Sequence, residues 1–216
     1  MFGLNFGFLS KYWIYYTAGL WMTLKLAFWT LIFSTIIGVV LGMIRVGKNK
    51  AVNTAIDMWI SFIRGVPVML IVFIVYYGIA TGLPSFWAGV VVLTVNSSVY
   101  IAEHTRAGMQ ADNKGQMEAA RCIGMSHLEG NMYIIIPQAI KNILPSLANE
   151  FILLIKNTSI VSVIAIQELT YKSSIVRTNT FRAFEPLIVS AFIYFTVTWI
   201  LNQGVRLLER RLHRND

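Results

Sequence analysis

Residues 115–137 read GQMEAARCIGMSHLEGNMYIIIP, and this stretch between two apolar runs decides the fold. Residues 118–123 are mostly good helix formers, and Gly124 suits the left-handed conformation that ends many helices. Ser126 and Glu129 then form the Ser-x-x-Glu pattern of a capping box, which starts a second short helix. The stretch therefore predicts two short helices that meet at an angle and are joined by a glycine elbow.

The chain around this stretch is too apolar for a water-soluble globule. Of its 216 residues, 56% are hydrophobic and 13% are charged, and the mean hydropathy is +0.62. A soluble domain carries about 25% charged residues, and a disordered chain needs low hydrophobicity. The composition thus excludes an ordinary soluble enzyme and a disordered chain. Because Cys122 is the single cysteine, an internal disulfide is impossible and a thiolate metal site is not expected.

The apolar runs are long enough to cross a membrane, since a spanning helix needs about 20 mostly apolar residues. In the second predicted span, residues 58–80, Arg64-Gly65-Val66-Pro67 interrupt the apolar run. The fourth, residues 137–155, begins at Pro137, which suits the first turn of a helix. Residues 103–136 form the polar insert, and residues 156–185 predict a broken or re-entrant element followed by an external loop. The predicted spans are residues 19–44, 58–80, 85–102, 137–155 and 186–201.

The net charge of +8 comes from 18 basic and 10 acidic residues. In a soluble chain this excess would indicate nucleic-acid binding, whereas in a membrane chain basic residues gather in cytoplasmic loops. Five spans place eleven of the basic residues on one side, which predicts an N-terminus outside and a cytoplasmic C-terminus. The last external loop holds Lys172, Arg177 and Arg182, which weakens this asymmetry without reversing it. The eleven are Arg45, Lys48, Lys50, Arg106, Lys114, Arg121, Lys141, Arg206, Arg210, Arg211 and Arg214.

Four segments carry a resemblance to a known family. Glu118-Ala119-Ala120, three further residues, Gly124 and a run closing on Ile-x-Pro resemble the cytoplasmic signature loop of bacterial ABC importer permeases. Arg64-Gly65-Val66-Pro67 is similar to the family's Arg-Gly-Thr-Pro segment, with Val66 in place of Thr. Residues 96–103 and 148–159 resemble the polar amino acid branch (His/Glu/Gln/Arg/opine). The resemblance covers roughly residues 15–210, in order.

This resemblance implies an all-α, type I ABC importer permease of about five spans, with residues 1–216 as one transmembrane domain in the bacterial inner membrane. The insert, about residues 114–134, would dock as coupling helices into a separate ATPase dimer. The small side chains of Ala119 and Ala120 would let that partner approach the backbone. Further implied partners are a second copy or a related permease, an extracytoplasmic binding protein and an amino acid. The candidate coupling residues are Glu118, Ala119, Ala120, Gly124, Ser126 and His127.

No Gly-x4-Gly-Lys-Ser/Thr loop is present, so this chain is not expected to hydrolyse ATP itself. ATP and Mg²⁺ would belong to the partner ATPase, and no cofactor is expected in the chain. The three histidines are scattered along the cytoplasmic side, and they predict no metal site. On the residues alone, the insert is equally well interpreted as a solvated helical loop.

Polar groups inside spans are costly, so they are candidates for substrate contact. Asn96 lies 11 residues after Ser85, and Glu150 lies 11 residues after Ala139, which corresponds to a depth of about 16 Å for each. We expect Glu150 to pair with the substrate ammonium and Asn96 to donate to its carboxylate. Carbonyls freed at the interruption, at Gly65 and Val66, would assist Glu150, and Asp57 would neutralise a cationic side chain.

Each of these candidates also has a structural interpretation. Glu150 would pair with Lys156 or Lys141, Asn96 would form an interhelical hydrogen bond, and Asp57 would pair with Lys141 or Arg64. Gly38 and Gly42 form either a close-packing Gly-x-x-x-Gly pattern or ordinary small residues of a membrane helix.

Two other functions were weighed against the permease. An ion-coupled secondary amino acid transporter would need an ion site and usually an inverted repeat, and no clear repeat is visible. An intramembrane enzyme would need paired aspartates, a histidine pair or a serine with a base, and the spans lack them.

Overall fold

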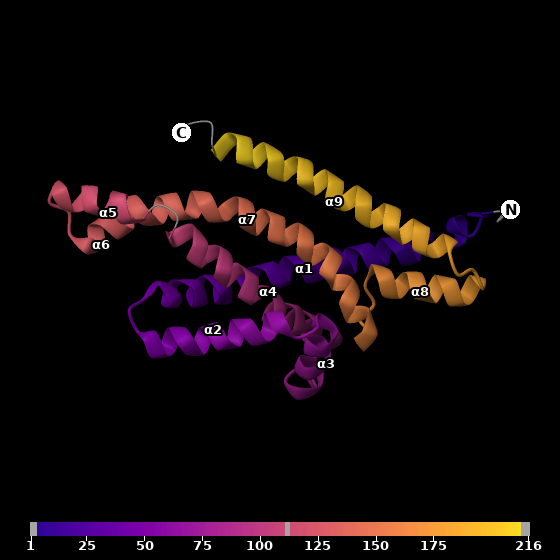
Figure 1. Cartoon of the computed structure of the whole chain (residues 1–216). Helices are drawn as coiled ribbons and strands as arrows, with labels where there is room; N and C mark the ends of the chain where they lie inside the picture. Colours follow the sequence, from indigo (N-terminus) through magenta and orange to yellow (C-terminus); the bar gives the residue numbers. More distant parts are fainter. Residues whose placement is uncertain (1–3, 111–112, 213–216) are drawn as a thin grey trace.

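The computed structural model describes residues 4–110 and 113–212, and among these it contains helices and no strand (Figure 1). Side chains are not described at positions 110, 113, 114, 127, 131, 139, 142 and 212. The predicted all-α fold is confirmed. In chain order the helices are α1 (Leu9–Val46), α2 (Lys50–Gly65), α3 (Val68–Gly78), α4 (Ser85–Gln110), α5 (Asn113–Cys122), α6 (His127–Gly130), the π-helical η1 (Asn131–Ile135), α7 (Ile136–Asn157), the 3₁₀ helix η2 (Thr158–Ile164), α8 (Leu169–Thr180) and α9 (Glu185–Leu212).

Four helical segments are long and apolar enough to span a membrane, and a fifth span is formed if the bent pair α2 and α3 is counted as one. The two helices of this pair meet at 113° where Val66 and Pro67 interrupt them, as the sequence predicts. Large apolar side chains such as Trp21 and Phe192 are more than 60% exposed. Such surfaces need lipid or another subunit to cover them.

Two elements differ from their predicted bounds. α1 begins ten residues before the predicted first span, because the aromatic residues that precede the span continue the helix. Residues 156–185 are not mainly a loop: they complete α7 and form η2 and α8. Glu168 starts α8, since its carboxylate accepts hydrogen bonds from the backbone N–H groups of Thr170 at 2.8 Å and Tyr171 at 2.7 Å.

α8 is held to its neighbours by buried polar contacts. The Tyr194 hydroxyl on α9 donates to the Glu168 carboxylate at 2.8 Å. The backbone N–H of Leu169 donates to the Thr23 hydroxyl on α1 at 3.2 Å. Glu168 and Leu169 are fully buried. α8 therefore joins α1 and α9 at the end of the molecule that holds the start of the chain (Figure 1).

α1 and α4 pack backbone to backbone. A Cβ atom added to Gly38 would come within 2.7 Å of the Ser98 carbonyl oxygen, and one added to Gly42 within 2.8 Å of the Ala102 carbonyl oxygen. Real Cβ atoms do not approach so closely, so only glycine fits at these positions. The close-packing interpretation of the Gly-x-x-x-Gly pattern is confirmed.

We expect Gly42→Ala to lower the free energy of unfolding by about 1–3 kcal/mol, because its methyl group would overlap Thr105 and the Ala102 carbonyl. Gly204→Ala in α9 is the matched control, since a Cβ atom there meets nothing within 4 Å. Denaturant unfolding of both variants in detergent micelles measures the difference. Equal stabilities for the two variants would show that the α1–α4 contact is not tight.

Candidate functional site

α5 and α6 form an elbow at one end of the molecule, away from the α8–α9 turn (Figure 1). Gly124 joins the two helices with a φ of 87°, in the left-handed region that favours glycine. The backbone N–H of Met125 returns to the carbonyl of Ala120 at 3.1 Å, which closes the end of α5. The predicted glycine elbow is confirmed.

The start of α6 is a reciprocal capping box, as predicted. The backbone N–H of Ser126 donates to Glu129 Oε2 at 2.8 Å, and the backbone N–H of Glu129 donates to Ser126 Oγ at 3.3 Å. These hydrogen bonds from Ser126 favour the charged carboxylate, so the pKa of Glu129 lies below its usual value of 4.5.

The second helix of the elbow does not end before the next span. α6 continues through the π-helical turn η1 into α7, and Pro137 lies in the first turn of α7, as predicted. The apolar residues that follow Asn131 sustain the helix, which the pattern of two separate short helices did not predict. The elbow is thus continuous with a membrane span, α7.

The two helices of the elbow pack through small residues. A Cβ atom added to Gly130 would lie 2.9 Å from Met117 Sδ and 3.4 Å from Ala120 Cβ. Ala120 is only 1% exposed, so its side chain contacts α6 and offers no surface to a partner. The expectation that Ala120 admits a partner is therefore wrong, because the packing against Gly130 covers it.

Other candidate coupling residues lie on the surface. Glu118, Ala119, Gly124 and Ser126 are exposed on the elbow. His127 begins α6, but its side chain lies outside the described part of the structure. These exposed residues are accessible for contact with a partner.

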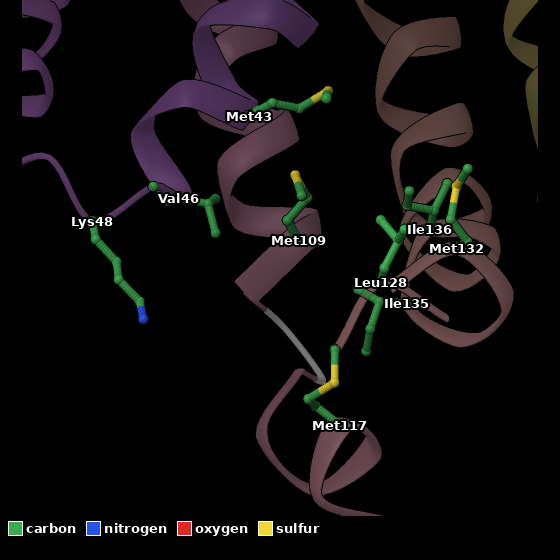
Figure 2. A pocket seen from close by; sticks show the side chains of 10 residues that line it. Met43, Val46, Lys48, Met109, Met117, Leu128, Met132, Ile135 and Ile136 are labelled. Carbon is green, nitrogen blue, oxygen red and sulfur yellow. The ribbon is translucent and has the colours of Figure 1, made fainter. Parts of the chain in front are cut away.

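An apolar cavity of about 590 Å³ separates the elbow from the spans. It lies where the ends of α1 and α4 face α5, α6 and η1, and Figure 2 shows their side chains around it. Four flexible methionine side chains line it, and such side chains adapt to changes in shape. The methionines are Met43, Met109, Met117 and Met132.

α4 and α7 bring two predicted substrate residues to one place. Asn96 on α4 and Glu150 on α7 are each 4% exposed, and Glu150 lies beside Ser97. Among the described residues, Thr94 Oγ1 and Asn96 Oδ1 are buried without a hydrogen-bond partner. Buried polar atoms without a partner are rare in folded proteins, so this group is distinct from the apolar surroundings of the spans.

The α1–α4 contact shows how far this polar group lies from the end of α1, measured along the helix axis. Ser98 lies level with Gly38, which is eight residues before α1 ends at Val46, or about 12 Å along the helix. Asn96 is two residues farther from that end, at about 15 Å. Since Glu150 lies beside Ser97, it lies at a similar level.

The side chain of Arg64, beside the α2–α3 interruption, reaches α4. The Arg64 guanidinium lies 5.8 Å from the ring centre of Tyr100, which is one turn along α4 from Asn96. Pro67 has no N–H group, so the carbonyls before it lose a regular helical donor. Gly65 faces open space, since an added Cβ atom would meet nothing within 4 Å, and Val66 is half-buried.

Asp57 does not join this group. It pairs with Arg45 at 2.5 Å, and the same guanidinium pairs with Glu103 at 2.9 Å. Arg64 and Arg106 also approach Glu103, at 3.8 and 3.3 Å. The structural interpretation of Asp57 named Lys141 or Arg64 as its partner, whereas the partner in the structure is Arg45. The Arg45 side chain is 8% exposed, and its long reach from α1 was not visible in the sequence.

Sequence reasoning also missed Glu168 and its contact with Tyr194. The signal was present, because an acidic residue directly before a short polar helix is a common N-cap. Across the described residues, no group of three or more histidine, cysteine, aspartate or glutamate side chains could hold a metal ion.

Known proteins resemble the chain over nearly its full length. Residues 34–214 match the family model described as binding-protein-dependent transport system inner membrane component. The probable glutamine ABC transporter permease protein GlnM of Bacillus subtilis (strain 168) is 38% identical over 203 residues, which cover 93% of this chain and 94% of that protein. The arginine transport system permease protein ArtQ of the same organism is 36% identical over 202 residues and 92% of each chain.

Solved structures of transporters also match this chain. The crystal structure of an amino acid ABC transporter with histidines matches with a TM-score of 0.90 and 41% identity, over 96% of this chain and 99% of that one. An inward-facing structure of the MetNI methionine ABC transporter matches with a TM-score of 0.77 and 16% identity, over 91% and 95% of the two chains. The second match shows a shared fold alone.

We expect Glu129→Ala to open the start of α6, so that amide hydrogen exchange at residues 126–130 becomes several-fold faster. Glu118→Ala is the control, because no contact of Glu118 caps a helix in the described structure. Exchange measured by mass spectrometry in the detergent-solubilised protein distinguishes the two variants. Equal rates in both would contradict the capping role.

Lowering the pH should destabilise the start of α6, as the Glu129→Ala substitution does. Because the folded-state pKa of Glu129 lies below 4.5, the stabilisation is complete above that pH and is lost as the pH falls through the folded-state value. Protection of the same amides, corrected for intrinsic exchange, should therefore fall in acid in the wild-type protein and change little in Glu129→Ala.

Proposed function

The chain belongs to the family of binding-protein-dependent transport system inner membrane components, and we propose that it is the permease of an ATP-driven importer for a polar amino acid. Its fold is that of a type I ABC importer permease, as predicted. The relatives named for glutamine and arginine transport support a substrate of that class.

The α5–α6 elbow is the observation that carries this proposal. It projects beyond the spans, exposes Glu118 and Ala119, and continues without a break into α7. A partner that gripped residues 118–131 would therefore move a membrane span. The methionine-lined cavity beneath the elbow leaves room for that movement, because the elbow is not packed solidly against α1 and α4.

In this proposal the energy comes from a separate ATPase dimer, which would hold ATP and Mg²⁺. The elbow lies on the cytoplasmic side, so α1 begins outside the membrane and α9 ends in the cytoplasm. A second copy of the chain, or a related permease, would supply the other half of the pore. An extracytoplasmic binding protein would deliver the amino acid at the opposite end.

The substrate site is proposed at Asn96 and Glu150, about halfway through a bilayer core of about 30 Å. The Glu150 carboxylate would accept hydrogen bonds from the substrate ammonium, and the Asn96 amide would donate to the substrate carboxylate. Carbonyls near Gly65 and Val66 would supply further acceptors, because interrupted helices expose backbone groups to solutes in transporters. The buried hydroxyl groups of Thr94 and Ser97 favour a polar ligand here.

Asp57 has a structural role in this scheme. Its contact with Arg45 neutralises it, and it lies on the ion-pair network rather than beside Glu150. We therefore remove it from the substrate site.

Reconstitution tests the function directly. The chain, assembled in proteoliposomes with a partner ATPase, should accumulate glutamine or arginine when ATP and a binding protein are present. Uptake by the chain alone, driven by an ion gradient, would instead support a secondary transporter.

Glu150→Gln should reduce amino acid uptake about 10- to 100-fold, since a charge-assisted hydrogen bond to the ammonium is lost. Glu209→Gln in the last helix is the control and should leave uptake unchanged. Uptake is measured with radiolabelled amino acid, and size-exclusion chromatography checks assembly. Unchanged uptake in a normally assembled Glu150→Gln transporter would remove Glu150 from the site.

Gly124→Ala should lower the amount of amino acid moved per ATP hydrolysed, because alanine strains a backbone with a φ of 87° and shifts the elbow. Gly115→Ala is the matched control, as its position has open space and no positive φ. Uptake and phosphate release are followed in the same vesicles. Equal ratios in both variants would speak against a coupling role for the elbow.

A further inference from the structure

The α8–α9 turn carries an aromatic side chain that the fold does not use. Phe181 is 96% exposed, and its φ of 54° lies in the left-handed region that residues other than glycine rarely adopt. Phe184, three residues on, is 62% exposed. Neither side chain lies in a described hydrophobic cluster of the chain.

A shallow hollow of about 310 Å³ lies beside Phe181. Arg177 and Arg182 both line it, together with hydroxyl groups of Ser174 and Thr178. Arg177 is half-buried, and its side chain lines the hollow. A guanidinium that lines a hollow is suited to a carboxylate, which it can bind through paired N–H groups.

The turn is held in place rather than loose. Arg182 Nη1 donates to the Asn5 carbonyl oxygen at 3.1 Å and to Glu185 Oε1 at 2.8 Å. These contacts fasten the turn to the start of the chain and to α9. The hollow therefore has a fixed shape, which lowers the entropic cost of binding a partner.

The end of the molecule that holds the α8–α9 turn is positively charged. Lys11, Lys172, Arg177 and Arg182 lie toward it, whereas the acidic side chains there are Glu168, which is fully buried, and Glu185, which pairs with Arg182. Basic residues are disfavoured in short loops on the outer side of a membrane. Their presence here calls for a partner with the opposite charge.

We infer that Phe181 and the hollow between Arg177 and Arg182 form the docking point for an acidic surface of the extracytoplasmic binding protein. Phe181 inserts into an apolar depression of that protein, and an aspartate or glutamate of the partner enters the hollow. This inference rests on the proposed function, since it takes the α8–α9 turn to lie outside, opposite the α5–α6 elbow (Figure 1).

The test titrates the complete transporter with binding protein. The permease and its ATPase are assembled in nanodiscs of neutral phosphatidylcholine, and ATP hydrolysis is followed as the ligand-loaded binding protein encoded beside the gene is added. For Arg177→Gln with Phe181→Ser, the half-saturating concentration should rise about tenfold, with hydrolysis in the absence of binding protein unchanged. For Arg177→Lys with Phe181 intact, the half-saturating concentration of binding protein should stay within a few-fold of the wild-type value.

Lys11→Gln is the matched control, since it removes a cation from the same end without touching the hollow. A half-saturating concentration within twofold of wild type in the double variant would overturn the inference. So would an equal rise in Lys11→Gln, which would show that total charge matters and not the hollow. A defect that appears only with anionic lipid in the nanodisc would assign the turn to lipid contact instead. Failure of the wild-type transporter to respond to any binding protein would overturn the proposed function as well.

Discussion

The backbone contact between α1 and α4 is the constraint on which the other parts of the molecule depend. Gly38 and Gly42 remove side chains from the contact, so the carbonyls of Ser98 and Ala102 approach α1 directly. α4 carries the polar group around Asn96 and leads into the α5–α6 elbow. One close contact therefore fixes both the level of the proposed substrate site and the position from which the elbow extends.

Two different environments meet at the elbow end of this contact. On one side Arg45 links Asp57 and Glu103 and so ties α2 to α1 and α4. On the other side the methionine-lined cavity leaves the elbow unsupported by solid packing. Ion pairs with good geometry resist displacement, whereas flexible thioether side chains accommodate it. In the proposed mechanism, α1, α2 and α4 would form a frame against which α5, α6 and α7 move.

Local features of the fold could be predicted from the sequence, and features that depend on distant residues could not. The Gly124 elbow and the Ser126–Glu129 capping box are set by residues within a few positions, so their patterns were sufficient. The burial of Ala120 depends on Gly130, and the partner of Asp57 comes from another helix. The residue spacing predicted one depth for Asn96 and Glu150. The buried polar oxygen atoms around them, which come from other residues, became visible only in the three-dimensional structure.

The polarity of α4 also bears on how the chain enters the membrane during synthesis. α1 is the more apolar of the two, whereas α4 carries Asn96, Glu103 and several hydroxyl groups. In lipid these groups would be costly, but most of them are covered once α4 lies against α1 and Arg45 meets Glu103. It follows that the glycine contact does more than join two helices: by bringing α4 against α1, it also shields the polar groups of α4 from lipid.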